Sequence, residues 1–412
     1  MTTLLTTPSK DRPAPSATPH PWGRYGAVLA LGSFAMGTDS FVIAGILPQL
    51  ARGLREPVGA AGLVVTAFAL TYGLTAPFLG AFTAKLPRKA LMAVALSVFI
   101  LANLASAAAP TLALLLAARV AAGIGAALYT PNASAAAATL AGPARRGRAL
   151  AVILGGMTVG TVLGVPVGTA IGQHVNWQAS LVFVAAVGAL ALAGLLLTLP
   201  ALALPPAVPI TTRLNVLVRG RVLAMVAFML LASAGSIMVY TYIAEVLGKT
   251  ARITGTTLAI TLLLWGIGGM VGAFGSGWLT DRLGASVTLL VVVGLLAVSL
   301  AALTVATSIA LVMVVMTLNG AAAWAVSTPN NHRLTALVPE LPSVVISSNS
   351  SGIYLGQALG AALGGILLSN GFSTADLCLA GTAFAVVALG LNLFIVRTTP
   401  NQAAAEVDGV VG

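Results

Sequence analysis

The sequence predicts an all-α integral membrane protein in which twelve transmembrane helices form two six-helix bundles. The first observation behind this prediction is composition: of 412 residues, 58% are hydrophobic and 7% are charged, and the mean hydropathy is +1.02. A soluble domain carries about 25% charged residues, whereas an apolar run of about 20 residues can cross a bilayer. The second observation is the number of such runs, and the third is an internal repeat.

Twelve apolar runs follow one another along the chain, separated by charges or turn residues. Two boundaries lack charges, because no Lys, Arg, Asp or Glu occurs between Arg148 and Arg213 or between Arg282 and Arg333. Each of these stretches is too long for one helix, and the sequence GQHVNW at 172–177 supplies a turn in the first. The predicted spans are 24–47, 59–81, 89–108, 111–139, 149–171, 178–199, 222–246, 254–279, 286–305, 308–330, 343–368 and 374–396.

The spans divide into an N-terminal bundle at 24–199 and a C-terminal bundle at 222–397, joined by a proline-rich cytoplasmic linker at 200–221. We expect disordered cytoplasmic tails at 1–23 and 398–412, because the first of these is polar and lacks the apolar core of a signal peptide. Of the 20 basic residues, one falls inside a span, four lie on the side away from the termini, and fifteen lie on the side of the termini. Both termini are therefore predicted to face the cytoplasm.

Three anchors indicate that the two bundles are repeats of each other. The tripeptide TPN occurs at 130–132 and 328–330, and GAFTAKL at 80–86 aligns with GWLTDRL at 277–283. The glycines spaced over 156–168 return over 352–364. The three offsets are 198, 197 and 196 residues. A parallel repeat of this kind is typical of transporters in which one half rocks against the other.

The stretch GGMTVGTVLGVPVGTAIG, residues 155–172, has a glycine at every fourth position and Pro166 inside the run. In water, each interior glycine costs about 1 kcal/mol relative to alanine, and the proline about 3 kcal/mol. In lipid, small residues four apart let two helices approach closely, and neighbouring helices can satisfy the carbonyl that the proline frees. Because a four-residue step drifts by roughly 40°, we expect the stripe to wrap part-way round its helix and face more than one partner. Either packing alone or a hinge between the bundles would explain it.

Several motifs together resemble the Major Facilitator Superfamily, and within it the twelve-span drug:proton antiporters of the branch that exports sugars, nucleosides and chloramphenicol. GTVLGVPVGTAIG at 160–172 resembles their span-5 glycine–proline motif, RVAAGIGAALYTPN at 119–132 their span-4 motif, and GTDSFVIAGILPQLA at 37–51 their span-1 signature. YTYI at 240–243 and GSGWLTDRLG at 275–284 also fit this branch. The antiporter motif then comprises Gly156, Gly160, Gly164, Pro166 and Gly168.

The resemblance covers residues 24–397 and implies a secondary transporter with alternating access, which exports a small drug-like or sugar-like molecule in exchange for protons. A facilitator or importer of a sugar or nucleoside on the same fold is the alternative. The chain departs from the family pattern in three places. It has Ala84 where an aspartate is usual, Pro87 where a glycine is usual, and Ser40 where the branch commonly has its acid. The acid in this chain is one position earlier, at Asp39.

Asp39 is the one acid well inside a predicted span, and an ionisable residue at membrane depth by default suggests function. Span 1 runs outward and span 4 runs inward, so Asp39 and Arg119 both lie about 12 Å below the outer surface. Burying either charge alone is costly, so we expect a coupled pair whose separation controls loading and release of a proton. The alternative is a structural pair that neutralises itself and holds spans 1 and 4 together.

Other polar and aromatic residues within spans suggest a mixed polar and apolar substrate cavity. Tyr354 and Gln357 are three residues apart and so share one helix face. Any single one of these residues is more commonly a packing or interfacial residue than a ligand contact. The substrate-cavity candidates are Tyr72, Tyr129, Asn132, Tyr240, Tyr242, Trp265, Asn319, Trp324, Asn349, Tyr354 and Gln357.

A cytoplasmic gate is predicted from the repeat, which aligns Ala84 and Lys85 with Asp281 and Arg282. The resemblance implies that Asp281 braces the closed inside face, so we expect it near the basic start of span 5, where a helix N-terminus also favours an anion. The alternative is a solvated surface aspartate. The gate candidates are Lys85, Arg88, Lys89, Asp281 and Arg282, and the basic residues at the start of span 5 are Arg145, Arg146 and Arg148.

Other functional classes fit the sequence poorly. Its basic residues are not gathered on one face, as nucleic-acid binding requires. The three histidines lie in tails or loops, a single cysteine excludes a Cys-based metal site, and no phosphate-cradling glycine–lysine loop occurs. We therefore expect no enzymatic activity, cofactor, metal or nucleic-acid partner. The expected protein is a monomer that spans a bacterial inner membrane many times and binds a small-molecule substrate, protons and the lipid bilayer.

Overall fold

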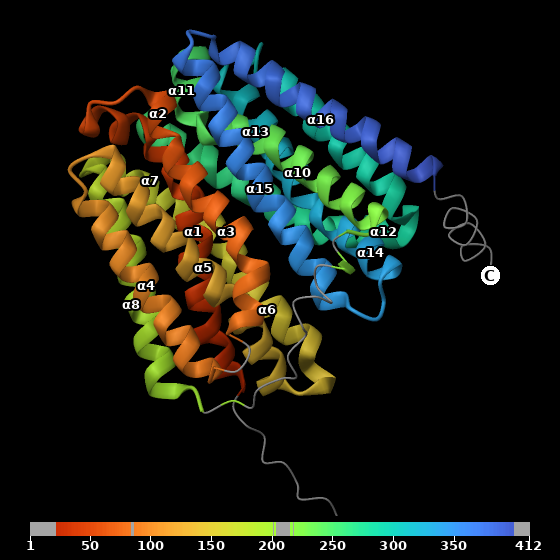
Figure 1. Ribbon diagram of the computed structural model, residues 1–412. Helices are drawn as coiled ribbons and strands as arrows, with labels where there is room; N and C mark the ends of the chain where they lie inside the picture. The colour runs from red at the N-terminus through yellow and green to blue at the C-terminus, as the bar shows by residue number, and fades with distance from the viewer. Residues whose placement is uncertain (1–21, 84–85, 201, 203–214, 217, 399–412) are drawn as a thin grey trace, which may run out of the picture.

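The computed structural model describes residues 22–83, 86–200, 202, 215–216 and 218–398, and these form helices joined by short connections (Figure 1). Residues 1–21, residues 399–412 and most of the predicted linker lie outside the described part of the chain. The described residues include eleven helices that are long and apolar enough to cross a membrane.

The N-terminal bundle contains six spans. The longest helix is α1, which runs to Leu54 rather than ending near residue 47, because Leu50 and Ala51 still pack into the core. The α8 helix begins where the Asn176 side chain accepts the backbone N–H of Ala179 at 2.8 Å, which ends the predicted GQHVNW turn. The elements are α1 (Trp22–Leu54), α2 (Val58–Ala61), α3 (Leu63–Phe82), α4 (Arg88–Ala108), α5 (Leu112–Ala141), η1 (Pro143–Arg145), α6 (Arg146–Val159), η2 (Gly160–Gly164), α7 (Val165–His174) and α8 (Trp177–Thr198).

The C-terminal bundle repeats this order, and one of its helices carries two spans. The 48 residues of α12 are broken at Gly284, where φ is 77° and ψ is 156°. Glycine adopts this left-handed conformation at little cost, so the chain turns there and a second span begins. Counting α12 twice gives twelve spans in the described residues, as predicted. The elements are α10 (Gly220–Thr241), α11 (Ile243–Thr250), α12 (Gly255–Ala302), α13 (Ile309–Ala325), α14 (Ser327–Leu337), α15 (Pro342–Ser369) and α16 (Thr374–Arg397).

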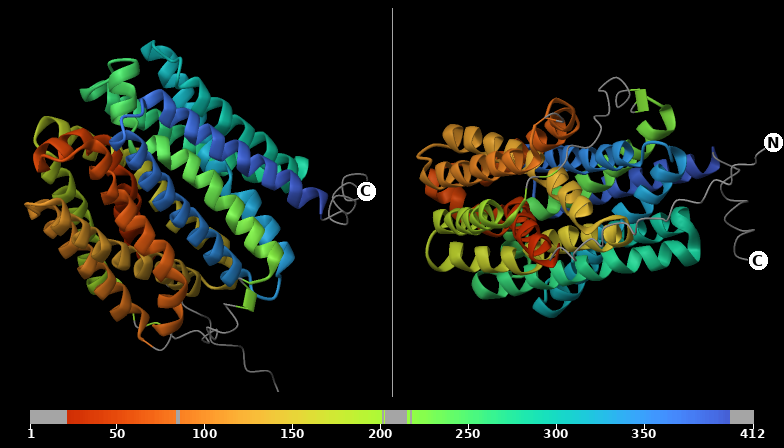
Figure 2. Two further views of the ribbon diagram at one scale, coloured as in Figure 1. Left: turned by 45° about the horizontal axis from the view of Figure 1, so that its top comes forward. Right: turned by 90° about the horizontal axis from the view of Figure 1, so that it is seen from below.

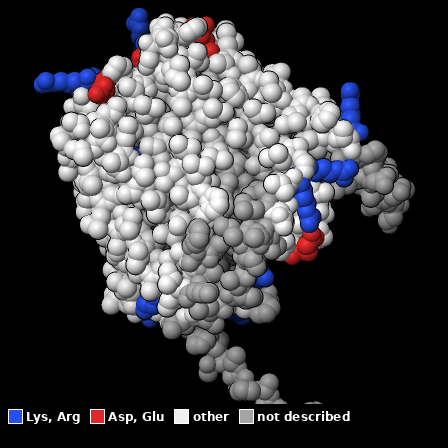
Figure 3. All heavy atoms as spheres, in the orientation of Figure 1, with Lys and Arg blue, Asp and Glu red and all other residues white. Residues whose placement is uncertain are grey.

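The two bundles lie side by side, the first coloured red to yellow-green and the second green to blue (Figure 2). An even number of spans brings the start of α1 and the end of α16 to one side, which we call the terminal end. The opposite side, where α1 ends and α2 begins, is the far end. On the face shown in Figure 3, charged side chains gather toward the two ends and the broad middle is nearly free of them, as a bilayer requires.

The glycine stripe of span 5 packs along α1 over its whole length, and its last glycine also meets α8, as expected of a stripe with more than one partner: a Cβ on Gly172 would collide with Ser180 Oγ. A Cβ on Gly156 or Gly160 would collide with the carbonyl of Ala30 or Phe34, both in α1. The remaining glycines of the stripe meet α1 at further four-residue steps: Gly164 at Thr38, Gly168 at Val42 and Gly172 at Ile46. The predicted drift of the stripe round its helix does not prevent continuous contact with α1. A row of residues four apart is inclined to the helix axis, and two such rows pack together when the two helices cross at an angle.

Pro166 is accommodated by one π-helical turn, η2, directly before it. The backbone N–H of Val165 bonds to the carbonyl of Gly160, five residues back, instead of following the α-helical pattern. The Thr38 hydroxyl of α1 donates to the same Gly160 carbonyl at 3.1 Å. A neighbouring helix therefore supports the distorted turn, as expected for a proline inside a membrane helix.

The C-terminal bundle repeats this packing with the same offset. A Cβ on Gly356 or Gly360 of α15 would collide with the carbonyl of Leu230 or Ala234 of α10. The pair of Gly356 and Leu230 corresponds to Gly160 and Phe34, each residue displaced by 196 positions. The pair of Gly360 and Ala234 corresponds in the same way to Gly164 and Thr38. The repeat read from the sequence is thus present as equivalent helix contacts in both bundles.

Two adjacent glycines give a matched test of this packing. We expect Gly156→Ala to destabilise the protein by about 1–3 kcal/mol, because the new methyl group forces α6 away from α1. Gly155→Ala should be neutral or slightly stabilising, because nothing lies within 4 Å of a Cβ at that position. Thermal unfolding of both purified variants checks this, and equal effects of the two substitutions would contradict it.

Candidate functional site

A buried ion pair links α1 to α5 inside the N-terminal bundle. Arg119 Nη1 donates to Asp39 Oδ1 at 2.8 Å, and the exposed fractions of the two side chains are 1% and 0%. Asp39 lies near the middle of α1, fifteen residues before Leu54, and Arg119 lies in the second turn of α5. The two charges therefore meet at one depth, although α1 extends further beyond Asp39 than the sequence indicated.

The surroundings leave part of this ion pair unsatisfied. The Phe68 ring centroid lies 4.7 Å from Arg119 Cζ, and Asn103 Oδ1 lies 3.5 Å from Nη1. Asp39 Oδ2 and Arg119 Nε have no hydrogen-bond partner among the described residues. A proton could therefore bind at Oδ2 without first displacing the arginine from Oδ1.

Four aromatic side chains meet where the two bundles touch, and we call them the aromatic cluster: Phe41, Tyr240, Trp265 and Trp324. The Phe41 ring of α1 lies 5.6, 5.7 and 5.8 Å from the rings of Tyr240, Trp265 and Trp324, which come from α10, α12 and α13 of the other bundle. Tyr240 and Trp265 are 4.1 Å apart, and Trp265 and Trp324 are 6.3 Å apart. These separations are close to those of favourable ring contacts.

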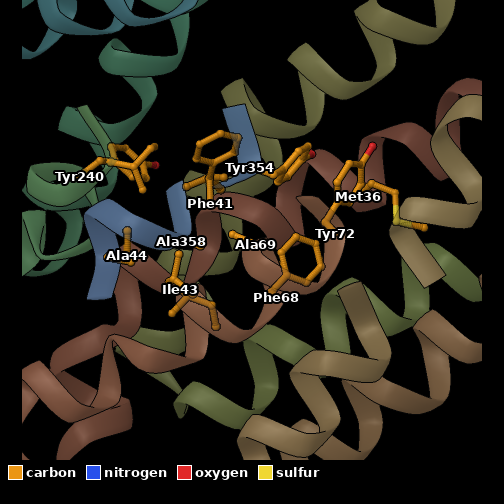
Figure 4. Close-up of a cluster of buried hydrophobic side chains, with 14 of the residues drawn as sticks. Met36, Phe41, Ile43, Ala44, Phe68, Ala69, Tyr72, Tyr240, Tyr354 and Ala358 are labelled. Carbon is orange, nitrogen blue, oxygen red and sulfur yellow. The ribbon is translucent and has the colours of Figure 1, made fainter. Parts of the chain in front are cut away.

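A second aromatic contact crosses between the bundles on the other side of Phe41 (Figure 4). The rings of Tyr72 in α3 and Tyr354 in α15 are stacked, with centroids 3.6 Å apart. The Tyr354 hydroxyl interacts with Ser40, the residue next to Asp39, and Tyr72 interacts with Thr130 of α5. Polar contacts therefore connect the C-terminal bundle to the residues beside the ion pair.

Asn319 supports the aromatic cluster from within the C-terminal bundle. The Trp265 Nε1–H donates to Asn319 Oδ1 at 3.1 Å, and Asn319 Nδ2 donates to Ser299 Oγ at 3.1 Å. This chain of hydrogen bonds fixes the indole plane. Asn319 therefore holds the Trp265 ring in place and does not itself face the other bundle.

Three other cavity candidates form hydrogen bonds inside one bundle. The Tyr129 hydroxyl donates to the Leu29 carbonyl at 2.9 Å, and Asn132 donates to the carbonyl of Leu128, one turn earlier in its own helix. Asn349 accepts from Asn330 Nδ2 at 2.7 Å within the C-terminal bundle. Gln357 is buried in α15, one turn from Tyr354.

Tyr242 closes the far end. Its hydroxyl donates to the Ala361 carbonyl at 2.8 Å and lies 3.4 Å from the Gly59 carbonyl of α2, in the other bundle. A Cβ on Gly59 would also overlap the Gly365 carbonyl. The two bundles are therefore in backbone contact at the far end.

The gate candidates do not meet across the bundles at the terminal end. Lys89 Nζ donates to the carbonyls of Leu196 and Leu199 at 3.0 and 2.5 Å and so caps α8 in its own bundle. Asp281 is exposed and, within the described residues, forms no ion pair. The Arg282 guanidinium lies 4.2 Å from the Trp278 ring of the same helix. Arg88 is partly buried, and its Nη1 has no hydrogen-bond partner among the described residues. Lys85 lies outside the described residues. The basic residues at the start of α6 are all exposed: Arg145, Arg146 and Arg148.

Sequence reasoning missed Phe41, which the structure places at the centre of the bundle interface. A signal was present, because residues two apart lie about 200° apart round a helix. If Asp39 faces Arg119 in its own bundle, Phe41 must face away from that bundle. Arg333 lies just after the predicted span 308–330, yet it is 5% exposed, and its Nη1 donates to Asn392 Oδ1 at 2.6 Å.

The chain matches the sequence profile described as the Major Facilitator Superfamily over residues 29–347 and 222–409. It is 31% identical to the uncharacterized MFS-type transporter YbcL of Bacillus subtilis, over 92% of this chain and 98% of that protein. It is 29% identical to the inner membrane transport protein YdhP of Escherichia coli, over 90% of this chain and 96% of that protein. It is 33% identical to a chloramphenicol resistance protein of Streptomyces lividans, over 63% of this chain and 67% of that protein.

The fold matches a solved structure of the same architecture. A bacterial homolog of the human lysosomal transporter Spinster, in an inward-facing and unoccupied conformation, superposes with a TM-score of 0.72 and 18% identity. The match covers 92% of this chain and 98% of the other. At this identity the match concerns the fold alone.

Proposed function

The chain belongs to the Major Facilitator Superfamily of transporters, and we propose that it works as a proton-coupled exporter of a small drug-like or sugar-like molecule. It is a multi-pass inner membrane protein rather than an enzyme. Alternating access between the two bundles would carry the substrate across. The chloramphenicol resistance protein among its relatives supports the outward direction.

The observation that carries the proposal is the buried pair of Asp39 and Arg119. Arg119 balances the charge of the buried Asp39 carboxylate, and if the arginine moved away, a bound proton would balance that charge in its place. Asp39 lies in α1, the helix that also carries Phe41 to the other bundle. Separation of the bundles would release Phe41 and let α1 shift against α5 within its own bundle. This shift would change the separation of the pair and link the proton to the direction of opening.

The described contacts suit an inward-facing state. We propose from the excess of Lys and Arg that the terminal end faces the cytoplasm. The side-chain contacts between bundles then lie at the outer end, through Tyr242, and in the middle, through the aromatic cluster and the tyrosine pair. In the outward-facing state these contacts would open and the terminal end would close.

The test uses inverted membrane vesicles that hold a pH-sensitive dye and an imposed proton gradient, acid inside. Chloramphenicol, pentoses, purine nucleosides and cationic dyes are added in turn. We expect at least one of them to release protons from the lumen, and vesicles without the protein to show no release. Downhill flux of a compound with no proton response to any would favour a facilitator.

Asp281 offers a separate test of the terminal end. We expect Asp281→Asn to slow transport several-fold, because closure of the cytoplasmic side loses the attraction between this acid and the basic start of α6. Hydrogen–deuterium exchange at the start of α6 should rise in the variant, as the open state becomes more populated. Glu340→Gln is the matched control, since this exposed acid pairs with Arg219 inside its own bundle. Unchanged transport and exchange in Asp281→Asn would show a solvated aspartate without a gating role.

A further inference from the structure

The structure also points to the chemical class of the substrate, an inference that rests on the proposed transport function. We infer that the aromatic cluster binds the ring of an uncharged aromatic solute that carries a hydrogen-bonding substituent. The argument uses the position of the four rings, an unpartnered hydroxyl and the charge of the site.

The four rings are divided between the moving parts. Phe41 comes from the N-terminal bundle, and Tyr240, Trp265 and Trp324 come from the C-terminal bundle. A solute that enters between the bundles from the terminal end would displace Phe41 and leave three ring faces without their partner. A flat aromatic ring of a solute can replace the Phe41 contacts, because ring pairs gain from offset and edge-to-face geometry beyond simple burial. Trp324 is partly exposed already, whereas the other three rings are buried, so it is the face a solute meets first.

A polar handle lies beside the rings. Tyr240 is 4% exposed, and its hydroxyl has no hydrogen-bond partner among the described residues. Ser236, one turn earlier on α10 and 5% exposed, has an unpartnered hydroxyl as well. Buried hydroxyls without partners are costly, and a hydroxyl or amide of a solute would satisfy them. Two hydroxyls suit one substituent and are too few for the many polar groups of a free sugar.

The charge of the site favours an uncharged solute. Asp39 is fully buried, and Arg119 occupies one of its oxygens. The other described acids are at least partly exposed, at the ends of spans or in connections. A cationic solute would therefore find no buried carboxylate whose charge is not already balanced by Arg119. The cost of removing the cation from water would be offset by the ring faces alone.

Equilibrium dialysis of the purified protein in detergent tests the ligand class without any gradient. The probes are chloramphenicol and adenosine, which are uncharged aromatics, xylose, which is uncharged without an aromatic ring, and tetraphenylphosphonium, which is an aromatic cation. We expect binding of at least one uncharged aromatic, with xylose and tetraphenylphosphonium at least tenfold weaker. Failure of both uncharged aromatics, or stronger binding of xylose or the cation, would overturn the inference.

Variants locate the binding at the cluster. Trp324→Ala should weaken binding of the uncharged aromatic at least tenfold, Trp324→Phe less than threefold, and Tyr240→Phe about three- to tenfold. Trp278→Phe is the control, because this exposed ring stacks on Arg282 away from the cluster. Unchanged affinity in folded Trp324→Ala and Tyr240→Phe would place the ligand elsewhere and refute the assignment.

A transport readout separates this inference from the proposed function. If one proton exchanges for an uncharged solute, each cycle moves one positive charge inward, so a membrane potential alone should drive export. Exchange of a monovalent cation for one proton would be electroneutral and insensitive to the potential. Selective binding of the uncharged aromatic without any potential-driven or proton-driven export would refute proton coupling and leave the ligand class standing.

Discussion

Replacing Asp39 by asparagine should abolish gradient-driven export while the protein stays folded and still binds its substrate. The amide keeps the shape of the side chain and an oxygen that can accept from Arg119 Nη1, which is 2.8 Å away in the wild type. It cannot take up or release a proton, so coupling fails even though the bundles can still rock. We expect substrate-induced proton release in inverted vesicles to fall to the level of empty vesicles.

Glu245→Gln is the matched control for that experiment. Glu245 pairs with Lys249 at 2.9 Å near the far end and is partly exposed, so its loss should change stability by no more than about 1 kcal/mol. Proton release should persist in this variant. Full proton-coupled transport in Asp39→Asn would instead show that Asp39 is structural and that another group carries the proton.

Much of the fold could be predicted because the bilayer restricts the choices. Spans must be long, apolar and helical, so composition and the breaks between runs indicated twelve of them. The glycine pattern predicted close helix packing, but it did not identify α1 as the partner, since the direction of a glycine stripe depends on how two helices cross. The sequence showed that the stripe returns after 196 residues, but the equal displacement of its partner residues in α1 and α10 emerged only from the contacts.

The candidate site was only partly predictable, because a side chain's role depends on which way its helix is turned. Tyr72, Tyr240, Trp265, Trp324 and Tyr354 do meet at the bundle interface. Tyr129 has the same residue type and lies in a span, yet it faces Leu29 inside one bundle. When a helix is apolar on all sides, composition and spacing do not show which of its sides faces the other bundle.

The gate candidates show a different limit. A contact that forms in only one conformation is absent from a structure of the other. Asp281 and the basic start of α6 are both exposed here, so the contact that we propose between them would belong to the other conformation. Lys89 is a separate matter, because its bonds to the end of α8 hold one bundle together and give it no partner in the other.

Removing the other half of the ion pair should have a large effect on stability. Arg119→Gln leaves the Asp39 carboxylate buried without its cation, and breaking a buried pair in this way costs about 3–5 kcal/mol. The double variant Asp39→Asn/Arg119→Gln leaves two neutral amides that can bond to each other. We expect it to recover most of the lost stability while remaining unable to couple transport to protons.

Arg333→Gln is the matched control, because among the described residues Arg333 is also a buried arginine, and it donates to the neutral Asn392. Its replacement leaves no carboxylate behind in that contact, so the loss should be smaller, about 1–3 kcal/mol. Thermal unfolding of the wild type, Arg119→Gln, the double variant and Arg333→Gln gives the differences in the free energy of unfolding. The vesicle assay shows whether each protein couples transport to protons. If Arg119→Gln and the double variant lost equal stability at alkaline as well as at acid pH, the cost would come from the missing arginine packing rather than from the stranded charge of Asp39. The carboxylate would then be tolerated without its partner, and a change in their separation could not be what loads and releases the proton.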